Sequence, residues 1–467
     1  MLKSMALAIT LAALPIVGQA KQWTLQECID YALQNNITLQ KSRLQTLSAH
    51  EDVQMSKAAL LPSLSLQTSQ NVTYRPWPES NRATVTNGYV ETSVDKVFYN
   101  GTYGLSSNWT VWNGNQNINQ IKLNKVTEQQ AEQETAVTAN SIQEQIAQLY
   151  VQILYSNEAI EVCRQSLQTS KTNEMRGQEF VNVGKMSKAD LAQLTAQRAQ
   201  DEYSLVEAEG NLRNFKRQLK QLLQLTTDED FDVVIPQTTD DMALQTIPVM
   251  TDVYNAALAT RPEIKSAQLG IESSDLNLKI ARAKRLPTIG VSASAATNTT
   301  SMSDNEWGQQ LKNNFDLGAG LTLSIPIFDN RQAKTAINKA KLQKQQYMLD
   351  LADKQTTLFS TIENYWLQAT TNQSMFQAAQ ASTESAQQSY DLLSEQFRLG
   401  LKNTVELMTG KSNLLNAQQN ELQNQNLKFR KGSFYFLNEH TINLLILFCI
   451  HPGTTAAQFM QHIVDPD

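Results

Sequence analysis

The sequence predicts a mostly helical fold with a small β part, in which long coiled-coil-like helices and four strands form a tandem repeat. Three observations predict it. The same order of helix, strand pair and long helix occurs twice in the 467 residues. Four short segments alternate between apolar and polar residues, and two long runs contain no proline and very little glycine. With a net charge of -6, the chain gives no electrostatic reason to expect nucleic-acid binding.

The first 20 residues have the composition of a secretory signal. Lys3 precedes an apolar stretch from Met5 to Val17, and Gly18-Gln19-Ala20 supplies the small residues of a cleavage site. No later apolar run approaches the roughly 20 residues of a transmembrane helix. We therefore expect an exported chain that is periplasmic, secreted or embedded in the outer membrane of a Gram-negative cell as β-strands.

The repeat is visible in three pairs of similar segments that keep the same order at an offset of about 216 to 225 residues, which chance rarely produces. The pairs are Leu60–Leu66 with Arg285–Val291, Gly104–Gly114 with Gly320–Asn330, and Gly184–Leu191 with Gly400–Leu407. The predicted domains are a signal peptide (1–20), a first repeat (21–230), a linker (231–250), a second repeat (251–431) and an atypical tail (432–467). The tail is either a lineage-specific extension or the product of an altered reading frame.

The alternating segments predict strands whose two faces meet different surroundings. Leu64 and Leu66 alternate with serines, and Ile289 and Val291 alternate with Thr288 and other small or polar residues. The other two segments lie at 104–111 and 317–327. Each is about 10 residues long, enough for a tilted strand to cross a bilayer. One such strand would fit an ordinary half-buried sheet of a soluble protein, but four paired strands favour a membrane barrel.

Four strands are too few to close a barrel, and open sheet edges are not tolerated in lipid. Single-chain barrels have at least about eight strands. We therefore expect the chain to supply one sector of a shared barrel and to be an oligomer. Polar loops are expected at 76–101 and 298–314.

The remaining sequence predicts helices over about 113–181 and 329–398, each roughly 100 Å long. Asn113 and Asp329 are expected N-caps. Pro62 and Pro287 mark the transitions from helix to strand, because proline cannot donate the next helical hydrogen bond. A solvated coiled coil without a channel would also explain the Gln- and Asn-rich faces of these helices.

The sequence does not favour an enzyme. Its three cysteines form no disulfide framework, and its four histidines lack metal-site spacing. We find no nucleophile and base pattern and no phosphate loop, so we expect no catalytic residue, no metal and no cofactor.

Several features of the sequence are shared with a known family. They are the junctions Leu61-Pro62-Ser63-Leu64 and Leu286-Pro287-Thr288-Ile289, the segment Ile325–Asp329 and the two turns beginning at Gly184 and Gly400. With these features, the chain resembles the TolC family of outer-membrane efflux ducts, and the resemblance extends from about Trp23 to Arg430. The resemblance implies a homotrimer with a 12-stranded barrel in outer-membrane lipid and a helical periplasmic tunnel. It also implies docking to an inner-membrane pump through a periplasmic adaptor. The expected function is passive conduction of cargo in efflux or type I secretion; the alternative is a non-conducting structural coiled-coil protein of the envelope.

The two turns have an explanation in helix stability alone. Gly184 and Gly400 suit the left-handed position that ends a helix. Ser187 and Asn403 are expected N-caps, each with an acidic residue three positions later.

The resemblance adds a second interpretation, in which the turns form a periplasmic aperture. Matching residue by residue places Phe397 at the family's gate tyrosine and Lys402 at its gate arginine. Asp190 matches the gate aspartate, and Glu406 and Thr409 match two ring aspartates. Lys402 can pair with Asp190 or Glu406, but without the bidentate geometry of arginine. We therefore expect a closed state held more weakly than in the family type.

Overall fold

The computed structural model describes residues 22–77, 81–85, 88–92, 96–226, 231–235 and 247–432. The expected signal peptide and residues 433–467 of the tail lie outside the described residues, as do residues 236–246 of the expected linker. The chain divides into two compact units. Unit 1 contains Met1–Lys41, Ala136–Arg261 and Thr356–Asp467, and unit 2 contains Ser42–Thr135 and Pro262–Gln355. Each unit therefore takes residues from both expected repeats.

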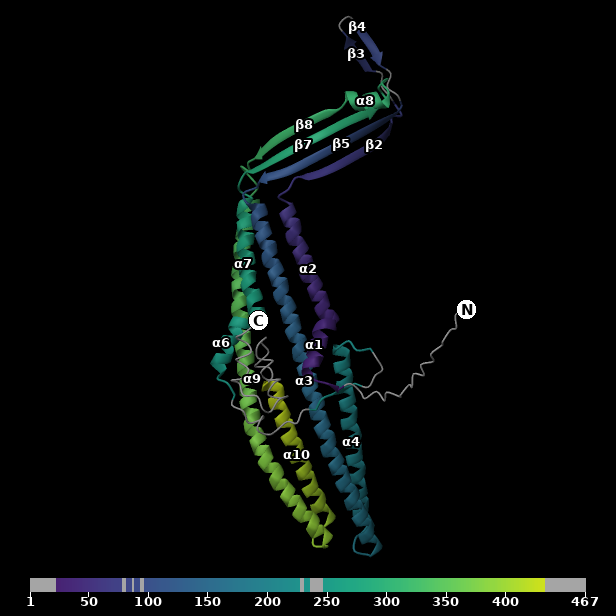
Figure 1. Cartoon of the computed structure of the whole chain (residues 1–467), viewed down its shortest axis with the longest axis vertical. Coiled ribbons are helices and arrows are strands. Elements are labelled where there is room, and N and C mark those ends of the chain that lie inside the picture. The colour runs from purple at the N-terminus through teal and green to yellow at the C-terminus, as the bar shows by residue number, and fades with distance from the viewer. Residues whose placement is uncertain are drawn as a thin grey trace, which may run out of the picture. The chain divides into compact units, whose positions relative to one another are not determined.

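Helices account for most of the described residues (Figure 1). They are α1 (Leu25–Asn35), α2 (Ile37–Ala58), α3 (Gln116–Asn182), α4 (Lys188–Leu222), α6 (Met250–Thr260), α7 (Pro262–Ala283), α8 (Trp307–Asn313), α9 (Gln332–Arg398) and α10 (Thr404–Gly432). The strands are β1 (Gln22–Trp23), β2 (Ser63–Tyr74), β3 (Asn81–Val85), β4 (Gly88–Thr92), β5 (Val97–Trp112), β6 (Asp232–Val233), β7 (Thr288–Thr300) and β8 (Asp316–Ser324). None of the described helices combines the length and the apolar composition of a membrane span.

The four expected strands form one sheet in unit 2 with the order β2-β5-β7-β8, and all three pairings are antiparallel. β2 and β5 come from the first expected repeat and β7 and β8 from the second, so the pairing of β5 with β7 joins the repeats (Figure 1). A register shift between Thr110 and Trp112 marks a bulge at one end of β5. β2 and β8 are the two edges of the sheet.

The last expected strand is shorter in the structure. We predicted Ile325 and Ile327 within it, but β8 ends at Ser324, opposite Thr288. Pro287 immediately precedes Thr288 and Pro326 follows Ser324 by two residues, and a proline cannot donate to a ladder. The prediction of plain loops was also incomplete, because 76–101 contains the β3–β4 hairpin and 298–314 contains α8.

The helices of unit 2 are joined side by side through polar contacts. The Ser42 Oγ of α2 lies 2.9 Å from the Thr135 Oγ1 of α3. The Lys344 Nζ of α9 donates to the Asp275 Oδ1 of α7 at 2.7 Å. A Cβ on Gly270 of α7 would lie 3.0 Å from the Tyr347 ring, so α7 and α9 approach closely at this glycine.

Two helices begin with the same local structure. The expected N-caps Asn113 and Asp329 lie two residues before the N-cap positions, because α3 and α9 begin at Gln116 and Gln332. Their side chains still accept from the first turn of each helix, the Asn113 Oδ1 from Asn117 N at 3.2 Å and the Asp329 Oδ2 from Ala333 N at 2.7 Å. The intervening chain has two successive residues with positive φ in both cases.

Unit 1 has its largest apolar core where α1, α3 and α4 meet the parallel strand pair β1–β6. The core includes Cys28, Ile146 and Leu219, each 0% exposed. Thr24 and Glu27 form a capping box at the start of α1. The Tyr150 hydroxyl of α3 donates to the backbone oxygen of Val234 at 2.6 Å, which ties the strand pair to the helices.

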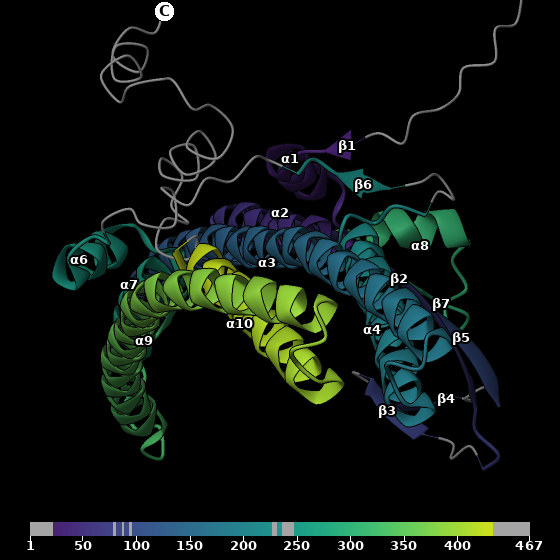
Figure 2. The same cartoon turned by 90° about the horizontal axis from the view of Figure 1, so that it is seen from below.

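The rest of unit 1 contains the ends of two helical hairpins. The first hairpin is α3 with α4, and the second hairpin is α9 with α10. α10 lies between α9 and the first hairpin in Figure 1, and Figure 2 shows the same helices from below. A second apolar cluster joins these helices through Leu194 of α4, Tyr390 and Phe397 of α9, and Leu407 and Leu414 of α10.

Candidate functional site

The sheet of unit 2 has two chemically different faces. Opposed residues of antiparallel strands lie on the same face, so the register assigns each side chain. One face carries hydroxyl, amide and glycine positions, including Ser63, Ser65, Gln67, Thr102, Ser106, Asn108, Ser292, Ser294, Gly318, Gly320 and Thr322. The other carries Leu64, Leu66, Val72, Leu105, Trp109, Ile289, Val291, Leu317, Leu321 and Leu323.

The apolar face is not part of a protein core. Leu66 is 78% exposed and Leu321 is 74% exposed on the single chain. Soluble monomers rarely leave so continuous an apolar surface uncovered. This face therefore needs an apolar environment that the chain does not supply.

Both hairpins turn at a glycine in the left-handed conformation. Gly184 has φ +72° and Gly400 has φ +76°. After each glycine, the next backbone N–H bonds back across the helix end, from Lys185 to the Phe180 oxygen and from Leu401 to the Gln396 oxygen, each at 2.8 Å. This pattern satisfies carbonyls that the helix end leaves free.

The helix that follows each turn has a side-chain cap. The Ser187 Oγ accepts from Asp190 N at 3.1 Å and donates to the Asp190 carboxylate at 2.7 Å. In the second turn each side chain accepts a hydrogen bond from the other residue's backbone N–H. Glu406 N donates to the Asn403 Oδ1 at 2.9 Å, and Asn403 N donates to the Glu406 Oε2 at 3.3 Å. These bonds fix the start of α4 and α10.

The other residues matched to the family's gate lie at the same turn. Lys402, in the turn before α10, donates to Glu406 in the first turn of that helix at 2.5 Å, and in the described residues no hydrogen bond or ion pair joins Lys402 to Asp190. The hydrogen bond from Lys402 and that from the Asn403 backbone hold the pKa of Glu406 below its usual range. Thr409 donates to the backbone oxygen of Val405 at 2.8 Å, within α10.

Phe397 has a packing role in the structure. Its side chain is 2% exposed, and its ring centroid lies 5.9 Å from that of Phe180 in α3. The ring therefore joins α9 to α3 by an apolar contact, without the polar link that a tyrosine hydroxyl could make.

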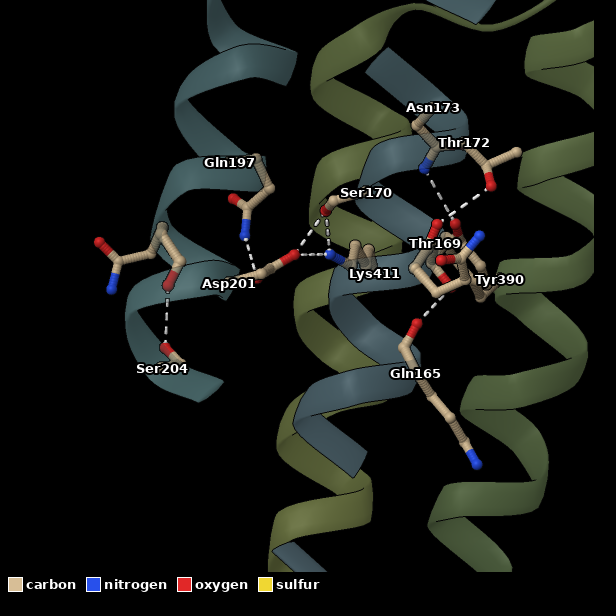
Figure 3. A network of polar contacts seen from close by, with 12 residues as sticks. Gln165, Thr169, Ser170, Thr172, Asn173, Gln197, Asp201, Ser204, Tyr390 and Lys411 are labelled. Atoms are coloured by element: carbon tan, nitrogen blue, oxygen red, sulfur yellow. Dashed lines mark hydrogen bonds and ion pairs between the residues drawn. The ribbon is translucent and has the colours of Figure 1, made fainter. Parts of the chain in front are cut away.

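A buried polar network between the hairpins was missed by the sequence analysis. Lys411 of α10 donates to the Asp201 carboxylate of α4 and to the Ser170 hydroxyl of α3 (Figure 3). Nearby, Asn173 of α3 donates to the Tyr390 hydroxyl of α9 at 3.2 Å. One sequence signal was available, because Lys411 falls on the same helical stripe as the apolar core residues of α10.

Burial changes the acid–base properties of this region. It lowers the pKa of Lys411, and the facing Asp201 carboxylate opposes that shift. Burial also raises the pKa of the Tyr390 hydroxyl. It raises the pKa of the Cys163 thiol as well, assisted by the negative charge of Asp201, so this thiol is poorly reactive. Within the described residues, no group of three or more His, Cys, Asp or Glu side chains could hold a metal ion.

The chain is similar to known proteins over most of its length. The family model described as outer membrane efflux protein matches residues 28–224 and 253–428. The outer membrane efflux protein BepC of Brucella suis is 22% identical over 88% of this chain and 84% of its own length. The toxin and drug export protein A of Aggregatibacter actinomycetemcomitans is 21% identical over 89% of this chain and 87% of its own length.

Solved structures share the fold. The Campylobacter jejuni outer membrane channel CmeC has a TM-score of 0.72 at 16% identity and covers 98% of this chain and 97% of its own. CusC has a TM-score of 0.74 at 15% identity and covers 93% of this chain and 99% of its own. The predicted helical repeat with a small strand section, the outer-membrane location and the efflux function are confirmed. The chain belongs to the outer membrane efflux protein family.

Proposed function

We propose that three copies of the chain form one passive exit duct, in which the sheets of unit 2 close a shared barrel of 12 strands. The two-faced sheet with two open edges carries this proposal. Its apolar face meets lipid and its hydroxyl-rich face lines an aqueous lumen, the arrangement of a transmembrane barrel.

The topology supports closure between copies. Strand directions alternate through β2, β5, β7 and β8, so β8 of one copy runs antiparallel to β2 of the next. Pairing these two edges satisfies the backbone groups that lipid cannot. A ring of identical copies has only this one kind of junction between sheets.

The helices of the same copies form the periplasmic tunnel. We propose that the turns at Gly184 and Gly400 form its mouth, where Asp190 and Glu406 supply acidic side chains. Loss of the second carboxylate at Thr409 leaves fewer acidic groups there than in the family type. Helix capping remains a sufficient role for Asp190 and Glu406, and conductance of their alanine variants separates the two roles.

The duct receives its cargo from other proteins in this proposal. Relatives include an alkaline protease secretion protein of Pseudomonas aeruginosa and a toluene efflux pump outer membrane protein of Pseudomonas putida. Cargo of such different kinds is selected more readily by an inner-membrane pump and periplasmic adaptor than by the duct. The chain itself supplies passage and the pump supplies energy.

The test uses the purified mature protein. Its mass in detergent, corrected for bound detergent, is expected to equal three chains, and in planar lipid bilayers the complex is expected to produce discrete conductance steps. The same sample after thermal unfolding is the control and should produce none. A monomer that stays soluble without detergent and gives no steps would contradict the proposal and favour the structural coiled-coil alternative.

A further inference from the structure

The turn regions of the two hairpins are each bonded internally. Lys402 bonds to Glu406 and Asp190 bonds to Ser187. Among the described residues, these bonds connect neither turn to the other hairpin. The Lys402–Glu406 pair is also exposed, with side-chain exposures of 37% and 40%. Exposed pairs of this spacing contribute little to stability, so this pair is poorly suited to hold the hairpins together.

A buried ionic contact between the hairpins lies further along the helices. Lys411 lies seven residues after Thr404, where α10 begins, a rise of about 10 Å in an α-helix. Lys411 is 6% exposed, and its two partners Asp201 and Ser170 are each 3% exposed. We call these three residues the inter-hairpin network. It joins α10 of the second hairpin to both helices of the first hairpin (Figure 3).

Every oxygen of the buried carboxylate has a partner. The Asp201 Oδ2 accepts from the Lys411 ammonium and from the Ser170 hydroxyl, the latter at 2.5 Å. The Asp201 Oδ1 accepts from the Gln197 amide at 3.0 Å. A buried charge that is fully paired is tolerated, whereas removing one partner leaves a charge that strongly favours contact with water.

Buried apolar residues flank the network on α10. Leu407 and Leu414 precede and follow Lys411 on the same face of α10, and both are buried. Movement of the second hairpin away from the first would expose both charged groups to water.

We propose that the inter-hairpin network, and not the Lys402–Glu406 pair, holds the two hairpins of each chain together and thereby sets the resting separation of the two turns. The inference rests on the proposed function, in which these turns surround the mouth of the duct. An ionic contact suits this role because it is stable when buried and its two halves are stable in water when separated.

Two variants are expected to differ in the separation of the hairpins. Lys411→Met keeps the side-chain length but leaves Asp201 buried and unpaired, so the hairpins should separate. The double variant Lys411→Met with Asp201→Leu replaces the pair by apolar groups, which removes the charge that water would stabilise. Its hairpins should stay together. A role in packing alone would change the melting temperatures without changing the separation of the turns.

The separation is measured by pulsed electron resonance between spin labels at Lys185→Cys and Leu401→Cys, one residue after each turn glycine. The native cysteines are replaced by alanine and labelled chains are diluted with unlabelled ones. Lys411→Met should widen the distance between labels, whereas the double variant and Lys402→Ala should keep the wild-type distance. If Lys411→Met does not assemble, Asp201→Asn takes its place, since it leaves the lysine unpaired and should also widen the distance.

Conductance gives a second measurement. Lys411→Met should increase the fraction of time in the open state about 10-fold or more, because an unpaired buried carboxylate strongly favours hydration. A wild-type label distance in Lys411→Met, or a widened distance in Lys402→Ala or in the double variant, would overturn the inference. If the distances change as expected but wild-type protein produces no conductance, the proposed function fails and the inter-hairpin network stands.

Discussion

An arginine on the apolar face of the sheet should prevent assembly in lipid, whereas an arginine one residue later should not. Leu321 lies on the apolar face opposite Val291, near the middle of β8. In a membrane barrel, an arginine facing the centre of the bilayer costs about 2–4 kcal/mol. The three arginines of one assembled trimer would together lower its stability by about 6–12 kcal/mol. Thr322 lies opposite Gly290 on the polar face, so Thr322→Arg should cost little.

The assay compares urea-induced unfolding of wild type, Leu321→Arg and Thr322→Arg after reconstitution into lipid vesicles. Leu321→Arg should unfold at much lower urea concentration or fail to assemble. Thr322→Arg should assemble and shift the ion selectivity of the lumen toward anions. Equal losses of stability at the two positions would refute the assignment of the faces.

Three further predictions concern the hairpin turns and α4. Gly400→Ala should lower the unfolding free energy by about 1–2 kcal/mol through backbone strain alone, because φ is +76° and no atom lies within 4 Å of a Cβ built there. Gly210→Ala, inside α4 with equally open surroundings, should instead raise the unfolding free energy by about 1 kcal/mol. Thermal unfolding measures both, and equal signs would contradict the argument. Asn403→Ala should cost about 1 kcal/mol by removing the cap of α10, and denaturant unfolding with no loss would exclude a capping role. Because Lys402 lowers the pKa of Glu406, the stabilisation from this carboxylate should be complete above the ordinary glutamate pKa and be lost as pH falls through the lowered pKa. Melting temperatures of wild type and Glu406→Gln from pH 7 to pH 3 should converge in acid, and parallel curves would contradict the shift.

Local patterns were enough to predict the strands and the long helices. Alternation at Thr288, Ile289 and Val291 requires only neighbouring residues, and it correctly assigned the two faces of β7. The signal for the two turns was equally local, because few residues other than glycine adopt a positive φ.

The inter-hairpin network could not be predicted from local patterns. Lys411 and Asp201 are 210 residues apart in sequence, and which helix faces which depends on packing of the whole hairpins. The partner of Lys402 could not be chosen from the sequence for the same reason, since both Asp190 and Glu406 were chemically suitable. The structure pairs Lys402 with Glu406, four residues later, and the buried ion pair between the hairpins lies at Lys411, a residue that the resemblance did not indicate.

Closure of the barrel between copies is the central claim, and cysteine cross-linking tests it most directly. Ser65→Cys on β2 is combined in turn with Gly320→Cys, Thr322→Cys and Ser324→Cys on β8, all on the polar face. A disulfide requires Cα atoms within about 7 Å, so one register should give covalent trimers on a non-reducing gel. Leu66→Cys with the same partners is the control, because its side chain points to the other face. Trimers cross-linked from Ser65→Cys and not from Leu66→Cys are predicted, and the absence of cross-linking in every register would contradict the shared barrel.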